Sequence, residues 1–185
     1  MSKEKKEKLE TVAFAGGCFW CTEAVFSRLK GVVDVTPGYT GGHTPDPDYE
    51  QVCTGTTGHA EAVLVRFRPG EIRFVELLEV FFDTHDPTTP DRQGNDVGTQ
   101  YRSAVFFTMP EQEQETVFYI KGLTELGIFE NPVVTEIAPL GTFYPAEDYH
   151  RDYFRNHPDQ AYCRMVIRPK VNKFTRIHAA KIKTG

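Results

Sequence analysis

The sequence has little of what marks a membrane, secreted or nucleic-acid-binding protein. No apolar run approaches the ~20 residues of a membrane-spanning helix, and the run over residues 12–15 is too short for a secretory signal. The formal net charge of −5 argues against a general nucleic-acid binder. Internal repeats and low-complexity linkers are also missing. We therefore expect a globular protein located in the cytoplasm.

Cysteine is scarce, with four residues in a chain of 185. A chain of this length can bury enough apolar surface to fold without disulfide bonds. In a reducing compartment, cysteines are more often catalytic, metal-bound or inert than paired in structural disulfides. The individual positions of Cys18, Cys21, Cys53 and Cys163 therefore need an explanation.

The distribution of charge divides the chain into three parts. Residues 1–10 form a charged leader, which we expect to be disordered, and residues 11–168 form one folded domain. From Arg164 to the end there are seven Lys or Arg residues and no acidic residue. We expect residues 169–185 to be a solvated, irregular basic tail; contact with a polyanion is the alternative.

The periodicity of apolar residues predicts an α+β fold. Strands are expected over 11–15, 32–42, 60–69, 102–108 and 133–138, and helices over 18–30, 73–85, 110–127 and 145–157. This order contains a split βαββαβ arrangement, which predicts a two-layer sandwich with a mostly antiparallel sheet and helices on one face. Two segments rich in Gly, Pro, Asp and Thr, 36–59 and 85–101, lack regular periodicity, and such long loops usually carry function.

The stretch "GGCFWC" places Cys18 after two glycines at an expected strand-to-helix transition. The free amides of a first helical turn favour negative charge and lower the pKa of a thiol, so this position predicts a reactive nucleophile. A small buried hydrophobic residue is the alternative. Cys21 follows one helical turn later, where the pair could form a disulfide or supply two metal ligands.

The stretch "GHAEAV" places Glu61 among small apolar neighbours at the start of an expected strand. Burial there would raise the pKa of the carboxyl, so that Glu61 stays protonated and can donate a proton. A solvated carboxylate is the simpler alternative. His59, two residues earlier, combines with Cys18 and Cys21 in a further hypothesis, a zinc enzyme.

A third cluster lies in the second long loop. Asp96, Tyr101 and Arg102 precede an expected strand, and Tyr49 in the first long loop could complete a ring of hydroxyl groups. Each residue alone also fits a structural role: an Asx turn, a tyrosine at the edge of the core, a surface arginine. The sequence leaves open whether these residues meet.

Five stretches together resemble the A-type peptide methionine sulfoxide reductases. They are "GGCFWC", "GYTGG", "YEQVCTGTTGHAEAV", "HDPTTPDRQGNDVGTQYRS" and "AEDYHRDYF", and the resemblance extends from about residue 12 to residue 165. It implies thiol-dependent reduction of methionine S-sulfoxide, free or in proteins, as a repair of oxidative damage. The implied roles are Cys18 as nucleophile, Glu61 as proton donor, Tyr49 and Tyr101 as hydrogen-bond partners of the sulfoxide oxygen, Asp96 as their supporting acid, and Phe19 and Trp20 as the pocket for the substrate methyl group.

The resemblance also implies how the enzyme is recycled. A sulfenic acid left on Cys18 condenses with a second cysteine, and an external dithiol such as thioredoxin reduces the resulting disulfide; no bound cofactor or metal is expected. Many family members have Gly at the position of Cys21 and a Gly-rich tail that is absent here. We favour Cys163 as the resolving cysteine, because a tail can swing toward Cys18, with Cys21 as the alternative. Cys53 is expected to pack in the core.

Other functions stay open at this point. Direct reduction of the sulfenic acid would need no resolving cysteine. A general dithiol-disulfide exchanger could be built on Cys18 and Cys21, and a module that binds methionine-containing peptides would need no reactive thiol at all. Nothing in the sequence demands more than a monomer.

Overall fold

Six strands form one sheet in the computed structural model, which describes residues 7–185. Their order is β7-β6-β1-β3-β2-β8, and all neighbours are antiparallel except β6 and β7. The strands are β1 (Glu10–Gly16), β2 (Val32–Thr40), β3 (Ala60–Phe67), β6 (Ser103–Phe107), β7 (Glu136–Pro139) and β8 (Tyr144–Pro145). A separate hairpin consists of β4 (Arg92–Gln93) and β5 (Asp96–Val97). The expected split βαββαβ core is confirmed, because β6, β1, β3 and β2 are adjacent in that order.

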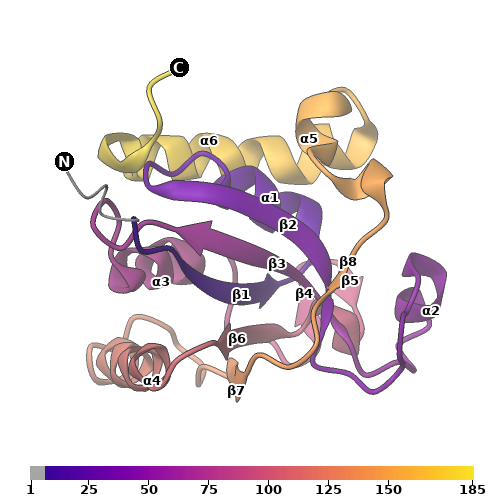
Figure 1. The fold of residues 1–185 in the computed structure, drawn as a ribbon, viewed down its shortest axis with the longest axis horizontal. Helices are drawn as coiled ribbons and strands as arrows, with labels where there is room; N and C mark the ends of the chain where they lie inside the picture. Colours follow the sequence, from indigo (N-terminus) through magenta and orange to yellow (C-terminus); the bar gives the residue numbers. More distant parts are fainter. Residues whose placement is uncertain (1–6) are drawn as a thin grey trace, which may run out of the picture.

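The helices cover one face of this sheet, as expected. They are α1 (Phe19–Phe26), α3 (Phe74–Asp83), α4 (Pro110–Glu125) and α6 (Arg168–Ile177), with the short α2 (Tyr49–Cys53) and α5 (Tyr153–Asn156) at the ends of loops (Figure 1). Phe14 of β1 joins sheet to helices, since its ring lies 4.9 Å from that of Phe26 in α1 and 4.9 Å from that of Phe81 in α3. Burial of these large rings is the main favourable term for the fold.

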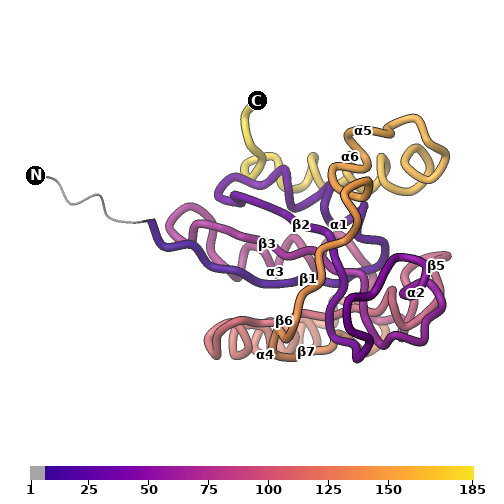
Figure 2. Tube along the Cα trace, turned by 45° about the vertical axis from the view of Figure 1, so that its right-hand side comes forward, coloured from indigo at the N-terminus to yellow at the C-terminus, as the bar shows by residue number. Residues whose placement is uncertain are grey.

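The opposite face of the sheet is lined by alanines and covered without a helix. Ala13, Ala62 and Ala104 pack there with Phe143 from the segment after β7. Figures 1 and 2 show this segment, in orange, running across the strands toward α5. The approach is close: a Cβ at Gly38 would collide with the carbonyl oxygen of Tyr144, so this position requires glycine.

The chain turns sharply at the end of β1. Gly17 has φ +94°, a conformation that favours glycine, and α1 begins two residues later. The beginning of β3 lies at the same end of the sheet, because β1 and β3 are antiparallel. Both α2 and the β4–β5 hairpin are found at this end too (Figure 1). The two long loops predicted to carry function therefore meet where Cys18 and Glu61 lie.

Residues 145–157 do not form the single helix that their composition predicts. A 3-10 turn over Asp148–His150 is followed by α5, and Asp152 between them has φ +53°. This left-handed residue cannot continue a helix, so the chain changes direction there.

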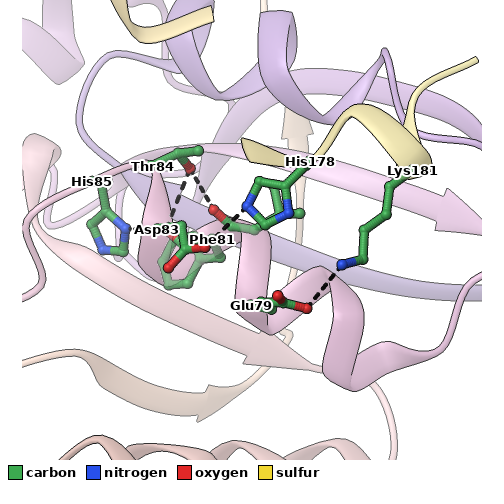
Figure 3. A network of polar contacts seen from close by, with 8 residues as sticks. Glu79, Phe81, Asp83, Thr84, His85, His178 and Lys181 are labelled. Atoms are coloured by element: carbon green, nitrogen blue, oxygen red, sulfur yellow. Dashed lines mark hydrogen bonds and ion pairs between the residues drawn. The ribbon is translucent and has the colours of Figure 1, made fainter. Parts of the chain in front are cut away.

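The prediction of an irregular tail is wrong. Residues 168–177 form α6, which packs against α1, and the residues after it are held to α3 by two polar side-chain contacts (Figure 3). His178 Nε2 lies 3.0 Å from Asp83 Oδ2, and Lys181 Nζ lies 3.0 Å from Glu79 Oε2. His178 and Lys181 of this segment thus contact carboxylates of α3, a helix that the sequence does not identify as their partner.

Two further findings concern the described part of the chain. None of its helices combines the length and the apolar character needed to cross a bilayer. Glu10 already belongs to β1, so the predicted leader ends one residue earlier than expected. The prediction for residues 1–6 lies outside the described residues.

Candidate active site

Cys18 lies at the N-cap of α1 and is half-buried. Burial raises the pKa of its thiol well above the ordinary value, and the hydrogen bond with Cys21 and the charge of Glu61 act in the same direction. The backbone N–H of Trp20 opposes them but is outweighed. The prediction that the helix N-terminus lowers the pKa of Cys18 is therefore wrong for this closed site. The free-energy cost of removing a thiolate from water exceeds the stabilisation that a single backbone amide provides.

Cys21 is buried one turn later, and its backbone N–H donates to the carbonyl of Cys18 over 3.1 Å. A hydrogen bond from the Cys18 thiol lowers the pKa of Cys21 to about 7, aided by the charge of Lys170 and the hydroxyl of Tyr162, while burial opposes this shift. The two thiols interact strongly, so they lose one proton near neutral pH and the second only at much higher pH. The pair can hold a single thiolate while one proton is shared between its sulfurs.

Glu61 on β3 is 1% exposed and faces the first turn of α1. Its Oε2 accepts a hydrogen bond of 3.2 Å from the backbone N–H of Phe19. Burial raises the pKa of Glu61 to about 8, and the charges of Asp96 and Cys21 add to this shift. Glu61 is therefore protonated at neutral pH, as its apolar sequence neighbours predict, and can donate a proton next to Cys18.

The tyrosines predicted from the two long loops lie near enough to Glu61 for its charge to affect both hydroxyls. Burial raises the pKa of Tyr49 and of Tyr101, and the charge of Glu61 is the second cause for both. Their hydroxyls therefore stay protonated and can act as hydrogen-bond donors. Asp96 accepts a hydrogen bond of 2.7 Å from the hydroxyl of Tyr162, which also lies 4.0 Å from Cys21 Sγ.

Phe19 and Trp20 stand in an aromatic cluster. The ring of Phe19 is 1% exposed and lies 5.0 Å from that of His150 and 6.5 Å from that of Tyr49. Trp20 stacks on Tyr153 with ring centres 3.7 Å apart, and its Nε1 donates to His150 Nδ1 over 3.0 Å. This bond fixes the indole, and it places the proton of a neutral His150 on Nε2, which has no hydrogen-bond partner among the described residues.

Several residues of this site were not predicted. They are Glu147, His150, Tyr153 and Tyr162, all from the segment between β8 and α6. The carboxyl of Glu147 accepts from the hydroxyl of Tyr39 at 2.9 Å and from the backbone N–H of Tyr49 at 3.1 Å. The stretch "AEDYHRDYF" carried a signal, since it is dense in aromatic and acidic residues, but a regular helix would have pointed them to different sides.

Cys163 and Cys53 differ from their predicted settings. Cys163 is 0% exposed and belongs to the same buried cluster as Cys21, at the start of a π-helical turn over Cys163–Ile167 that leads into α6. It does not lie on a swinging tail. Cys53, expected in the core, is exposed because it ends the short surface helix α2.

The residues of the zinc hypothesis do not assemble. His59 is held away from the thiols, with Nδ1 accepting from the Gly42 N–H at 3.0 Å and Nε2 lying 2.7 Å from the Thr44 carbonyl oxygen. Within residues 7–185, the group of His, Cys, Asp and Glu side chains close enough to share a metal ion is Glu79, Asp83 and His178, far along the chain from Cys18.

The raised pKa of Glu61 gives the protein a defined pH dependence. The folded state keeps this proton up to about pH 8, whereas an ordinary glutamate loses it near pH 4.5. The contribution of Glu61 to the free energy of unfolding is therefore complete below about pH 4.5. It falls as the pH rises from there toward about 8, by up to about 1.4 kcal/mol per pH unit. We expect Glu61→Gln to lack this fall in urea unfolding followed across that range. Glu23, whose pKa burial raises to about 7, is present in both proteins and cancels. Parallel curves for the two proteins would show that Glu61 is ionised.

Comparison with known proteins identifies the family. A family model described as peptide methionine sulfoxide reductase matches residues 10–183. The peptide methionine sulfoxide reductase MsrA of a Thermus thermophilus strain is 55% identical over 164 residues, which are 89% of this chain and 92% of that protein. The reduced form of Mxr1 from Saccharomyces cerevisiae gives a TM-score of 0.78 at 34% identity, covering 87% of this chain and 92% of that one. Mxr1 in complex with Trx2 gives 0.56 at 26% identity, covering 83% and 90%. The chain belongs to the peptide methionine sulfoxide reductase family.

Proposed function

We propose that this protein reduces methionine S-sulfoxide to methionine through the thiol of Cys18. Its membership in the peptide methionine sulfoxide reductase family supports the reaction and its role in repairing oxidised proteins. The observation that carries the assignment of residues is the contact between a protonated, buried Glu61 and the helix turn that begins at Cys18. A sulfoxide oxygen leaves poorly unless it is protonated, so a neutral acid beside a thiol suits this chemistry.

The first step moves the oxygen from the substrate to the enzyme. The Cys18 sulfur bonds to the sulfoxide sulfur while Glu61 protonates the sulfoxide oxygen, and the bond between the substrate's sulfur and oxygen breaks to release hydroxide. The hydroxide then bonds to the Cys18 sulfur, the new sulfur–sulfur bond breaks, and methionine leaves with that electron pair. The products are methionine, whose sulfur has gained two electrons, and a Cys18 sulfenic acid, whose sulfur has lost two. The proton that Cys18 loses on attack replaces the one that Glu61 gives.

The groups around Glu61 suit a sulfoxide. Tyr49 and Tyr101 keep their hydroxyl protons and lie within the electrostatic influence of Glu61, so they can hold the sulfoxide oxygen close to the acid. The aromatic cluster of Phe19 and Trp20 offers ring faces to the apolar methyl group. Asp96 supports this arrangement by accepting a hydrogen bond from the hydroxyl of Tyr162.

The resolving step has its nearest partner in Cys21. Cys21 already hydrogen-bonds Cys18, and its thiol is the one with the lowered pKa. Attack of Cys21 on the Cys18 sulfenic acid forms the disulfide and releases water. Cys163, buried in the same cluster as Cys21, can then attack Cys21 in a thiol-disulfide exchange, which returns Cys18 to its thiol form. We therefore place Cys21 before Cys163 in the cycle, in contrast to the order that the sequence favours.

An external dithiol completes the cycle. The solved complex of yeast Mxr1 with Trx2 supports thioredoxin as the reductant. Thioredoxin is oxidised to its disulfide, so the overall reaction converts methionine sulfoxide and a dithiol into methionine, a disulfide and water. All four cysteines are free in the structure, as the resting state of this cycle requires.

Two substitutions test the first step. Cys18→Ser should abolish sulfoxide reduction, and Glu61→Gln should slow methionine formation by about 10²- to 10⁴-fold, because the sulfoxide oxygen loses its acid. Both are measured as single-turnover formation of methionine from the S-sulfoxide. Cys53→Ser is the matched cysteine control and should keep the wild-type rate. A wild-type rate for Glu61→Gln at neutral pH would remove Glu61 from this role.

The order of the two resolving cysteines is tested by counting thiols after one turnover without reductant. Cys21→Ser should release one equivalent of methionine and leave Cys18 as a sulfenic acid, trapped by a dimedone reagent. Cys163→Ser should release the same methionine and contain a disulfide between Cys18 and Cys21, found by mass spectrometry. A Cys18–Cys163 disulfide at the wild-type rate in Cys21→Ser would reverse the order.

A further inference from the structure

We propose that Lys170, in the first turn of α6, is a positioning residue for the resolving step, holding Cys21 as a thiolate ready to attack the Cys18 sulfenic acid. This inference rests on the proposed function, in which Cys21 resolves Cys18. It gives a defined role to a lysine of the basic C-terminal segment, which the sequence predicts to be solvated.

Geometry brings the two residues together. A narrow cavity of about 10 Å³ lies between α1, α3 and α6, and both Cys21 and Lys170 line it, with Gly16, Thr22, Thr84 and His85. The side chain of Lys170 is half-buried, and its neighbour Val171 packs in the same buried cluster as Cys21. The backbone of α6 is therefore fixed at this point, and the lysine is directed by packing rather than free in solvent.

The charge of Lys170 is not neutralised by a carboxylate. No ion pair or hydrogen bond of its ammonium group occurs within residues 7–185, whereas Lys181 on the same segment is paired with Glu79. His85, the other basic residue of the cavity, is neutral because burial lowers its pKa to about 4. A cation without a partner beside a buried thiol stabilises the thiolate, and the effect is strong where water is excluded.

The remaining groups around Cys21 do not supply this charge. The positive charge of Lys170 helps to lower the pKa of Cys21 to about 7, after the larger contribution from Cys18. The other titratable groups around Cys21 carry no positive charge at neutral pH, and Cys18 among them shares a proton with Cys21. These groups are Cys18, Glu61, His85, Asp96, Tyr162 and Cys163.

The chemistry separates Lys170 from the sulfoxide step. When the Cys21 thiolate attacks the Cys18 sulfenic acid, a sulfur–sulfur bond forms, the sulfur–oxygen bond of Cys18 breaks, and the oxygen leaves as water after taking a proton. Lys170 stabilises the attacking sulfur and takes no part in these bonds. Its loss should slow disulfide formation without reducing the yield of methionine in one turnover.

The test compares Lys170→Met with Lys173→Met. Lys173 lies one turn along α6, is exposed, and does not line the cavity beside Cys21. Iodoacetamide labelling across pH, with Cys18 and Cys21 distinguished by tandem mass spectrometry, gives the titration of each thiol without any substrate. We expect Lys170→Met to move the midpoint for Cys21 upward by about one pH unit, Lys170→Arg to restore it, and Lys173→Met to leave it unchanged. In single turnovers, Lys170→Met should form the disulfide several-fold more slowly.

Two outcomes would overturn the inference: a wild-type Cys21 titration in Lys170→Met, or the same shift in Lys173→Met, which would indicate a general effect of the basic segment. If Lys170→Met fails to fold, Lys170→Gln provides a second neutral variant, and Lys170→Arg still tests whether charge is sufficient. The labelling needs no sulfoxide, so it judges Lys170 even if the wild-type protein fails to reduce methionine sulfoxide. That failure would reject the proposed function alone.

Discussion

The hydrogen bond from the Phe19 amide to Glu61 is the contact on which the site depends. It joins the first turn of α1 to the central strand β3 in a place that water does not reach. A carboxylate in this position would bind the amide more strongly, yet burial outweighs that gain and keeps the carboxyl neutral. The same exclusion of water raises the pKa of Cys18. One dry junction thus fixes the protonation of both the acid and the thiol.

That junction is closed by segments far apart in the sequence. The two long loops contribute Tyr49 and Asp96, and the segment between β8 and α6 brings His150 and Tyr162 into contact with them. The C-terminal helix closes the site from behind the thiols. Burial keeps the Cys18 thiol protonated, while its coupling with Cys21 allows the pair to carry one thiolate near neutral pH.

Much of this arrangement could be predicted from residues close to each other in sequence. Alternation in β3 and the alanines around Glu61 predict a buried acid, and the glycines before Cys18 predict its place at a helix start. The pKa of Cys18 could not be predicted in this way, because it depends on burial by residues more than a hundred positions away. The position of His150 could not be predicted for a related reason, because the left-handed Asp152 breaks the helix expected over residues 145–157. Tyr162 lies beyond that helix, and its contact with Asp96 links residues 66 positions apart in sequence. The path of the basic segment depends on acids of α3 that no local pattern links to it.

The central claim is that Glu61 is a neutral acid in the resting enzyme. Infrared absorption of protonated carboxyl groups, recorded as wild type minus Glu61→Gln, tests it most directly. The account predicts a carboxyl C=O band from Glu61 at neutral pH that disappears with a midpoint near pH 8. A difference spectrum that shows only carboxylate bands at neutral pH would contradict it.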